Sequence, residues 1–184
     1  MTRATAMTLI ASIDMRTMIM MMTRLMAILP TDNNDVDDCR EHWSGIGNSC
    51  YYMTGETSST LNDAQNKCKK ISAKLPIIKS ESENTFIHGL MSAKKSWIWL
   101  GMRRKQRRMV WSDGTPAESP DGALYSAWNK GEPSSGVDEN CAYLNFHDRG
   151  WNDNKCHYTA SSVPYVLCQE ERNKNGSSKT YTKD

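Results

Sequence analysis

Apolar residues recur at intervals of three and four in two stretches of the chain, and this is the pattern of helices with one buried face. The first stretch begins just after Thr60 and the second just after Ser80, and both residues are common helix N-caps. Glu83 lies three residues beyond Ser80, which is the spacing of a capping box. The apolar positions are Leu61, Ala64, Cys68 and Ile71 in the first stretch, and Phe86, Ile87, Leu90 and Met91 in the second. The pattern therefore predicts two helices, each with one face toward a core.

Short apolar runs rich in aromatic and β-branched residues predict strands before and after these helices. The first two strands form a hairpin from Trp43 to Tyr52 around a glycine-containing turn. A buried strand is expected at 97–101, and the run from Met109 to Trp111 is expected to return beside it. Further strands are predicted at 141–146, 150–153 and 164–169.

Between Gly114 and Asn140 the chain is rich in proline and glycine and has no sustained periodicity. A segment this long without regular structure inside a compact domain is normally functional. Oxygen-bearing side chains gather at its end and shortly after it: these are Glu132, Ser134, Glu139, Asn152 and Asp153. Calcium takes about 6 to 8 oxygen ligands, so three carboxylates, an amide and a hydroxyl form a suitable donor set. The alternative is that they are ordinary solvated turn residues.

The length of 184 residues, 38% of them hydrophobic and 24% charged, is enough for one globular domain with tails. Residues 1–30 hold eight of the twelve methionines and two imperfect signal-like stretches, so they are either a signal segment or a leader without that function. Residues 31–38 are expected to be an acidic linker, and the polar residues 170–184 a disordered tail. We place the domain at 39–169 and expect no transmembrane segment, since no apolar run approaches the roughly 18 residues that a spanning helix needs.

Charge and histidine content give no sign of a nucleic-acid partner or of catalysis. The formal net charge is only +2, so no overall field attracts nucleic acid or an anionic membrane. His42, His147 and His157 have no evident nucleophile beside them in the sequence. We therefore expect a protein that is not an enzyme.

One local charge feature is the basic run at 103–108. Its cations are Arg103, Arg104, Lys105, Arg107 and Arg108. Clustered guanidinium groups pair with sulfate or phosphate, so the run is a candidate site for sulfated glycans or anionic microbial surfaces. The alternative is a hairpin loop whose charges are only solvated.

Six cysteines, an even number without a C-x-x-C pair, favour a disulfide framework in an oxidising compartment over a zinc or redox site. They are Cys39, Cys50, Cys68, Cys141, Cys156 and Cys168. The cysteine positions by themselves leave the pairing open.

Three short motifs, together with these cysteines, resemble the long-loop calcium site of the C-type lectin domain family. The motifs are Glu132-Pro133-Ser134, Glu139-Asn140-Cys141 and Trp151-Asn152-Asp153. The resemblance runs from about Cys39 to Gln169 and implies an α+β, disulfide-stapled fold of two helices, two small antiparallel sheets and a long calcium-binding loop. Ser134 departs from the family, which has Asn or Asp at that position.

The resemblance implies that one calcium ion is bound, and that the same residues bind the sugar: Glu132, Ser134, Glu139, Asn152 and Asp153. It also implies a cis peptide bond before Pro133. Many family members hold a second calcium on nearby acidic residues. This chain instead has Met102, Gln106, Ser135 and Asn140 in those regions, so we expect a single ion.

The family pattern further implies the disulfides Cys39 to Cys50, Cys68 to Cys168 and Cys141 to Cys156. The run at 97–101 resembles the Trp-Ile-Gly-Leu core strand of the family, with Trp99 where the family usually has glycine. Because glycine there gives room for close packing, we expect smaller neighbours to accommodate Trp99.

In the family, Glu-Pro-Asn sites favour mannose, fucose and N-acetylglucosamine, and Glu132 is of that kind. The resemblance therefore implies a secreted, calcium-dependent lectin that binds glycans of cell or microbial surfaces in microbe or self/non-self recognition. Oligomerisation would strengthen binding at one shallow site, and the sequence leaves it open. The alternative is an interaction domain of the same fold that binds protein, or sulfated glycan through 103–108, without a calcium-bridged sugar.

Overall fold

The computed structural model describes residues 39–134, 136, 138–158 and 163–172. The predicted leader and linker, and the tail from residue 173 onward, lie outside the described residues. Within these ranges, no helix combines the length and the apolar character needed to cross a bilayer.

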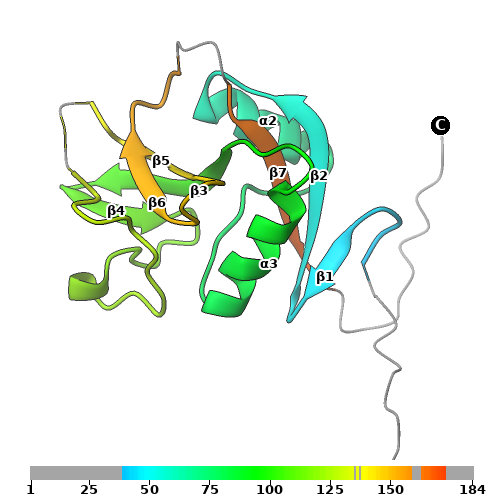
Figure 1. The fold of residues 1–184 in the computed structure, drawn as a ribbon, viewed down its shortest axis with the longest axis horizontal. Coiled ribbons are helices and arrows are strands. Elements are labelled where there is room, and N and C mark those ends of the chain that lie inside the picture. The colour runs from blue at the N-terminus through cyan, green and yellow to red at the C-terminus, as the bar shows by residue number, and fades with distance from the viewer. Residues whose placement is uncertain (1–38, 135, 137, 159–162, 173–184) are drawn as a thin grey trace, which may run out of the picture. The chain divides into compact units, whose positions relative to one another are not determined.

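The first half of the sheet is built from both ends of the domain (Figure 1). The hairpin of β1 (Ser44–Ile46) and β2 (Ser49–Thr57) is confirmed. Strand β2 pairs antiparallel with the last strand, β7 (Tyr165–Glu171), so the domain extends two residues beyond the predicted boundary. The N-terminal and C-terminal segments of the domain are thereby joined in one sheet.

The second half of the sheet carries the long loop. It contains β3 (Ile98–Lys105), β4 (Arg108–Trp111), β5 (Cys141–Leu144) and β6 (Trp151–Asn154), paired antiparallel in the order β4, β3, β5, β6. A parallel pairing of Ile98 with Tyr165 links β3 to β7. The prediction of two small sheets is therefore corrected: two antiparallel groups exist, but this pairing joins them into one seven-stranded sheet.

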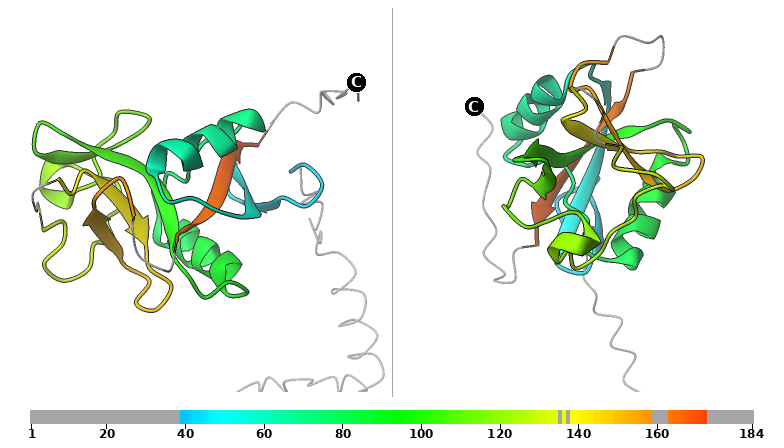
Figure 2. Two further views of the ribbon diagram at one scale, coloured as in Figure 1. Left: turned by 90° about the horizontal axis from the view of Figure 1, so that it is seen from above. Right: turned by 90° about the vertical axis from the view of Figure 1, so that its left-hand side faces the viewer.

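Both predicted helices are confirmed, and they lie on opposite sides of the β2–β7 pair (Figure 2). Helix α2 (Leu61–Lys70) begins at Thr60, whose Oγ1 accepts the Asp63 amide at 3.0 Å. Helix α3 (Glu81–Met91) begins at Ser80, whose Oγ accepts the Glu83 amide. Side chains alternate along β7, so Leu167 packs in the core under α3 while Val166 and Cys168 pack in the core under α2. Between β4 and β5 the described residues form one short 3-10 turn, η1 (Ser119–Asp121).

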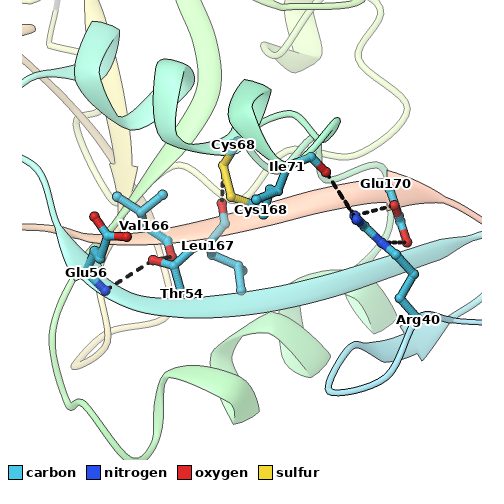
Figure 3. The surroundings of a disulfide bond; sticks show 9 residues. All are labelled: Arg40, Thr54, Glu56, Cys68, Ile71, Val166, Leu167, Cys168 and Glu170. Carbon is cyan, nitrogen blue, oxygen red and sulfur yellow. Dashed lines mark hydrogen bonds and ion pairs between the residues drawn. A yellow bond between two sulfur atoms is a disulfide. The ribbon is translucent and has the colours of Figure 1, made fainter. Parts of the chain in front are cut away.

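All three disulfides are the expected ones: Cys39 to Cys50, Cys68 to Cys168 and Cys141 to Cys156. Figure 3 shows how Cys68 of α2 is bonded to Cys168 of β7. Nearby, the Arg40 guanidinium pairs with Glu170 at 2.5 Å and donates to the Ile71 carbonyl at the end of α2. The start of the domain, the first helix and the last strand are thus fixed to one another.

The prediction that Trp99 stands at the position where this strand needs a glycine is wrong. Trp99 is fully buried, and its indole N–H donates to the Ser58 carbonyl at 2.9 Å. The position that needs a glycine is Gly101, where a Cβ would meet the Leu75 carbonyl oxygen at 2.9 Å and that of Pro76 at 3.0 Å. The Gly101 amide also donates to Pro76 at 2.8 Å, so this backbone approach is part of the fold.

We predict that Gly101→Ala destabilises the domain by about 1–3 kcal/mol, because the added methyl group must displace backbone rather than a mobile side chain. Gly89→Ala in α3 is the matched control, since a Cβ there meets nothing within 4 Å. The control is expected to be neutral or stabilising by up to about 1 kcal/mol. Urea unfolding of the oxidised domain measures both, and equal midpoints for the two variants would contradict the prediction.

Candidate functional site

The end of the long loop is held beside β6 by backbone hydrogen bonds. The Trp151 amide donates to Ala127 at 2.8 Å, and the Asn129 amide donates back to Trp151 at 3.0 Å. The Glu132 amide then closes a turn onto the Asn129 carbonyl at 2.9 Å. Residues 127–132 therefore run along the strand that carries Asn152 and Asp153, and Glu132 arrives next to them.

Ser134 connects the three carboxylates of the predicted site. Its amide donates to Asp153 Oδ1 at 2.9 Å and to Glu132 Oε2 at 3.1 Å. Its hydroxyl donates to Glu139 Oε2 at 2.7 Å and lies 3.3 Å from Asp153 Oδ1. The peptide bond between Glu132 and Pro133 is cis, as expected. The structure thus brings together four of the five predicted residues.

The fifth residue, Asn152, is oriented by a neighbour that the sequence did not reveal. Its Oδ1 accepts a hydrogen bond from Asn129 Nδ2 at 3.1 Å. Its own Nδ2 is buried and has no hydrogen-bond partner among the described residues. The amide of Asn152 is therefore only partly satisfied in this arrangement, which is unusual for a buried polar group.

Arg104 enters the same site from β3. Its Nη2 forms an ion pair with Asp153 Oδ2 at 2.5 Å, and its Nε donates to the Glu139 carbonyl at 3.0 Å. The Asp153 side chain is 0% exposed and that of Arg104 only 11%. From the sequence, Arg104 was expected to be a surface cation like its neighbours, whereas the structure places it at the candidate site.

The other cations of the basic run point to separate places. Arg103 donates to Asn62 Oδ1 on α2, and Arg108 pairs with Asp121 at 3.3 Å. Lys105 and Arg107 are exposed. The five cations therefore do not form one common patch, and anion binding at this hairpin stays a prediction.

Glu132 has a strongly altered acidity. Burial and the neighbouring Asp153 carboxylate raise the pKa of Glu132 from its ordinary 4.5 to about 7. Two carboxylates close together disfavour full ionisation of both. Near neutral pH, Glu132 is therefore only partly ionised, and the negative charge of the site is lower than three ionised carboxylates would give.

Two glycines give the site side chains room. A Cβ on Gly136 would lie 2.1 Å from Glu139 Oε2, and a Cβ on Gly150 would lie 1.7 Å from Asn129 Oδ1. Asn84 of α3 holds the preceding residue of β6, since its Oδ1 accepts the Trp151 indole N–H at 2.9 Å. None of these supporting residues was predicted, although the glycines in a ligand-bearing loop were a visible signal.

The residue types at the site suit a hard cation, but their present geometry is not that of a metal centre. In the part of the chain that the structure describes, no group of three or more His, Cys, Asp or Glu side chains is placed to hold a metal ion. The carboxylate oxygens face Ser134 and Arg104 instead. The oxygen donors and the raised pKa of Glu132 fit calcium chemically, provided that Ser134 yields some of its hydrogen bonds.

The sequence of this chain is similar to those of several known proteins. C-type lectin domain family 4 member M of Symphalangus syndactylus is 31% identical over 138 residues, which are 72% of this chain and 31% of the relative. CD209 antigen-like protein A of Mus musculus is 34% identical over 64% of this chain and 48% of its own length. The chain thus spans a third to a half of these curated relatives.

The structural comparison agrees. The carbohydrate-recognition domain of cow CD23, solved in the presence of a GlcNAc2Man3 oligosaccharide, has a TM-score of 0.61 and 26% identity over 73% of this chain and 97% of that one. A family model described as the lectin C-type domain matches residues 57–170. With the fold, the three disulfides and the loop motifs in place, this chain belongs to the C-type lectin domain family.

Proposed function

We propose that this domain is a calcium-dependent lectin whose ion and sugar are bound by Glu132, Ser134, Glu139, Asn152 and Asp153. The observation that carries the proposal is the convergence on Ser134 of carboxylates from the long loop and from β6. Family membership supports binding of glycans in general. The proposal adds the metal, the residues and the class of sugar.

The residues of the chain have distinct tasks in this proposal. Glu132, Glu139 and Asp153 supply negative oxygens, while Ser134 and Asn152 supply neutral ones. Calcium, when bound, offers coordination positions to two neighbouring hydroxyls of a sugar. The carboxylates accept hydrogen bonds from those hydroxyls.

The sugar class follows from the loop motif and from the relatives. The Glu132-Pro133 pair is of the type associated with mannose, fucose and N-acetylglucosamine. The cow CD23 domain was solved with an oligosaccharide of mannose and N-acetylglucosamine, and a murine dendritic cell inhibitory receptor 2 domain of 26% identity was solved with an N-glycan. Mannose-containing glycans of cell or microbial surfaces are therefore the proposed ligands.

Secretion and a role in innate recognition belong to the same proposal. All six cysteines are paired, which suits an oxidising extracellular compartment. The relatives include CD209 antigen-like protein A of Mus musculus, which supports a role in recognition.

A second candidate function is an interaction domain that needs no calcium-bridged sugar. It is favoured by the ion pair of Arg104 with Asp153, which places a cation of the chain itself on a predicted metal ligand. Retention of the domain on mannan-agarose in the presence of calcium separates the two candidates.

We predict that the refolded, oxidised domain is retained on mannan-agarose with calcium and is eluted by EDTA and by free mannose. Glu139→Gln removes a charged ligand and should weaken calcium binding by roughly tenfold or more. Glu56→Gln is the control, since Glu56 is an exposed carboxylate that pairs with Lys67 away from the loop. Calcium titration and retention are measured on each, and a folded domain that passes through both mannan and galactose resins would favour the second candidate.

We also predict an unusual pH dependence in EDTA. Because the pKa of Glu132 is higher in the folded domain, the folded state binds more protons than the unfolded state between pH 4.5 and about 7. This contribution to stability is therefore present at low pH and is lost as the pH rises through about 7. The Glu132→Gln variant has no carboxyl group at this position, so its stability has no such pH-dependent contribution. The melting temperature of the variant minus that of wild type should therefore be larger at pH 8 than at pH 5. The same difference at both pH values would refute the prediction.

A further inference from the structure

Arg104 differs from the other cations of its hairpin because its side chain ends against a buried carboxylate. Lys105 and Arg107 are exposed, and Arg108 is mostly exposed in its pair with Asp121. The Arg104 side chain is only 11% exposed and ends against the fully buried side chain of Asp153. A buried cation in a run of surface cations requires a structural explanation.

The contacts of Arg104 join three separate segments of the site. From β3, its guanidinium reaches Asp153 Oδ2 on β6 at 2.5 Å and the Glu139 carbonyl of the loop at 3.0 Å. Its backbone amide donates to the Asn140 carbonyl at 2.9 Å. The other oxygen of Asp153 accepts the Ser134 amide at 2.9 Å. The Asp153 carboxylate therefore links Arg104 to Ser134. Arg104 in turn links Asp153 to residues 139–140 of the loop.

These contacts are of the kind that a bound cation makes. A cation at this place would neutralise the Asp153 carboxylate and polarise a backbone carbonyl of the loop, and the guanidinium does both. Its planar group of fixed donors also sets the directions of the two acceptors, which a spherical ion or a lysine ammonium does less strictly. Removing it would take away the cation that is paired with this buried carboxylate.

We propose that Arg104 is a built-in cation of the binding site, which positions Asp153, Ser134 and residues 139–140 without a second metal ion. The inference deepens the proposed function, because it assigns a positioning residue to the same site. The loop is then held close to its binding arrangement before calcium arrives, and one calcium ion completes it.

Hydrogen exchange in EDTA tests the proposal without calcium or sugar. Arg104→Gln removes the charge and is expected to speed exchange of the Ser134 amide by roughly tenfold or more, the effect of losing a charge-assisted contact. Arg104→Lys keeps a charge near Asp153 but loses the fixed donor directions with which the guanidinium also reaches the Glu139 carbonyl. We expect it to speed exchange of the amide at position 104, which closes on Asn140, more than exchange of Ser134.

Lys105→Gln is the matched control, since Lys105 is exposed on the same strand. Amides of the β2–β7 pair should exchange at the wild-type rate in every variant that folds, and they report on the fold as a whole. If Arg104→Gln does not fold, the Arg104→Lys and Lys105→Gln comparison still decides, because only the first should alter the loop. Unchanged exchange at Ser134 and at position 104 in the Arg104 variants would overturn the proposal.

Equilibrium dialysis with calcium gives a second measurement. We expect one bound ion in the wild-type domain, and two ions would overturn the proposal that Arg104 replaces one. Failure to bind mannan, with the exchange results as expected, would remove the proposed lectin function and leave the positioning role of Arg104 intact.

Discussion

The buried carboxylate of Asp153 is the group on which the arrangement of the long loop depends. A carboxylate that is 0% exposed requires partners for both oxygens, and here they come from different parts of the chain. Ser134 approaches one oxygen from the loop, and Arg104 approaches the other from β3. Since Glu132 and Glu139 also bond to Ser134, satisfying Asp153 places the remaining acidic residues of the site.

Asp153 holds a defined position because apolar packing immobilises Trp151, two residues earlier on β6. Trp151 is fully buried, and its ring makes edge contacts with Trp111, Tyr125 and Trp128 at centroid distances of 5.3–5.7 Å. Its indole N–H is held by Asn84 of α3. The motif Trp-Asn-Asp thus combines a hydrophobic anchor with the polar residues that it positions. The Cys141–Cys156 disulfide joins the start of β5 to the chain just after β6, the strand that carries this motif.

The sequence predicted what depends on local pattern or on motifs of the family. Both helices followed from their apolar spacing and from the caps at Thr60 and Ser80. Three short motifs led to the candidate site residues, four of which the structure brings together. The role of Arg104 could not be read in this way, because its partner lies 49 residues away and its neighbours are charged surface residues. The register of β3 was misjudged for a related reason. Both Trp99 and Gly101 lie in an apolar strand, and only the approach of the 75–76 backbone shows which position requires glycine.

The charges of the candidate site are consistent with the proposed single calcium ion. When fully ionised, Glu132, Glu139 and Asp153 carry three negative charges, and the Arg104 guanidinium balances one of them. The remaining excess equals the charge of a single calcium ion. Without that ion the domain meets the excess in part by protonation, since burial and Asp153 raise the pKa of Glu132 to about 7. In our proposal, a proton on Glu132 and a calcium ion at the site are alternatives, and the Arg104–Asp153 pair is kept in both states.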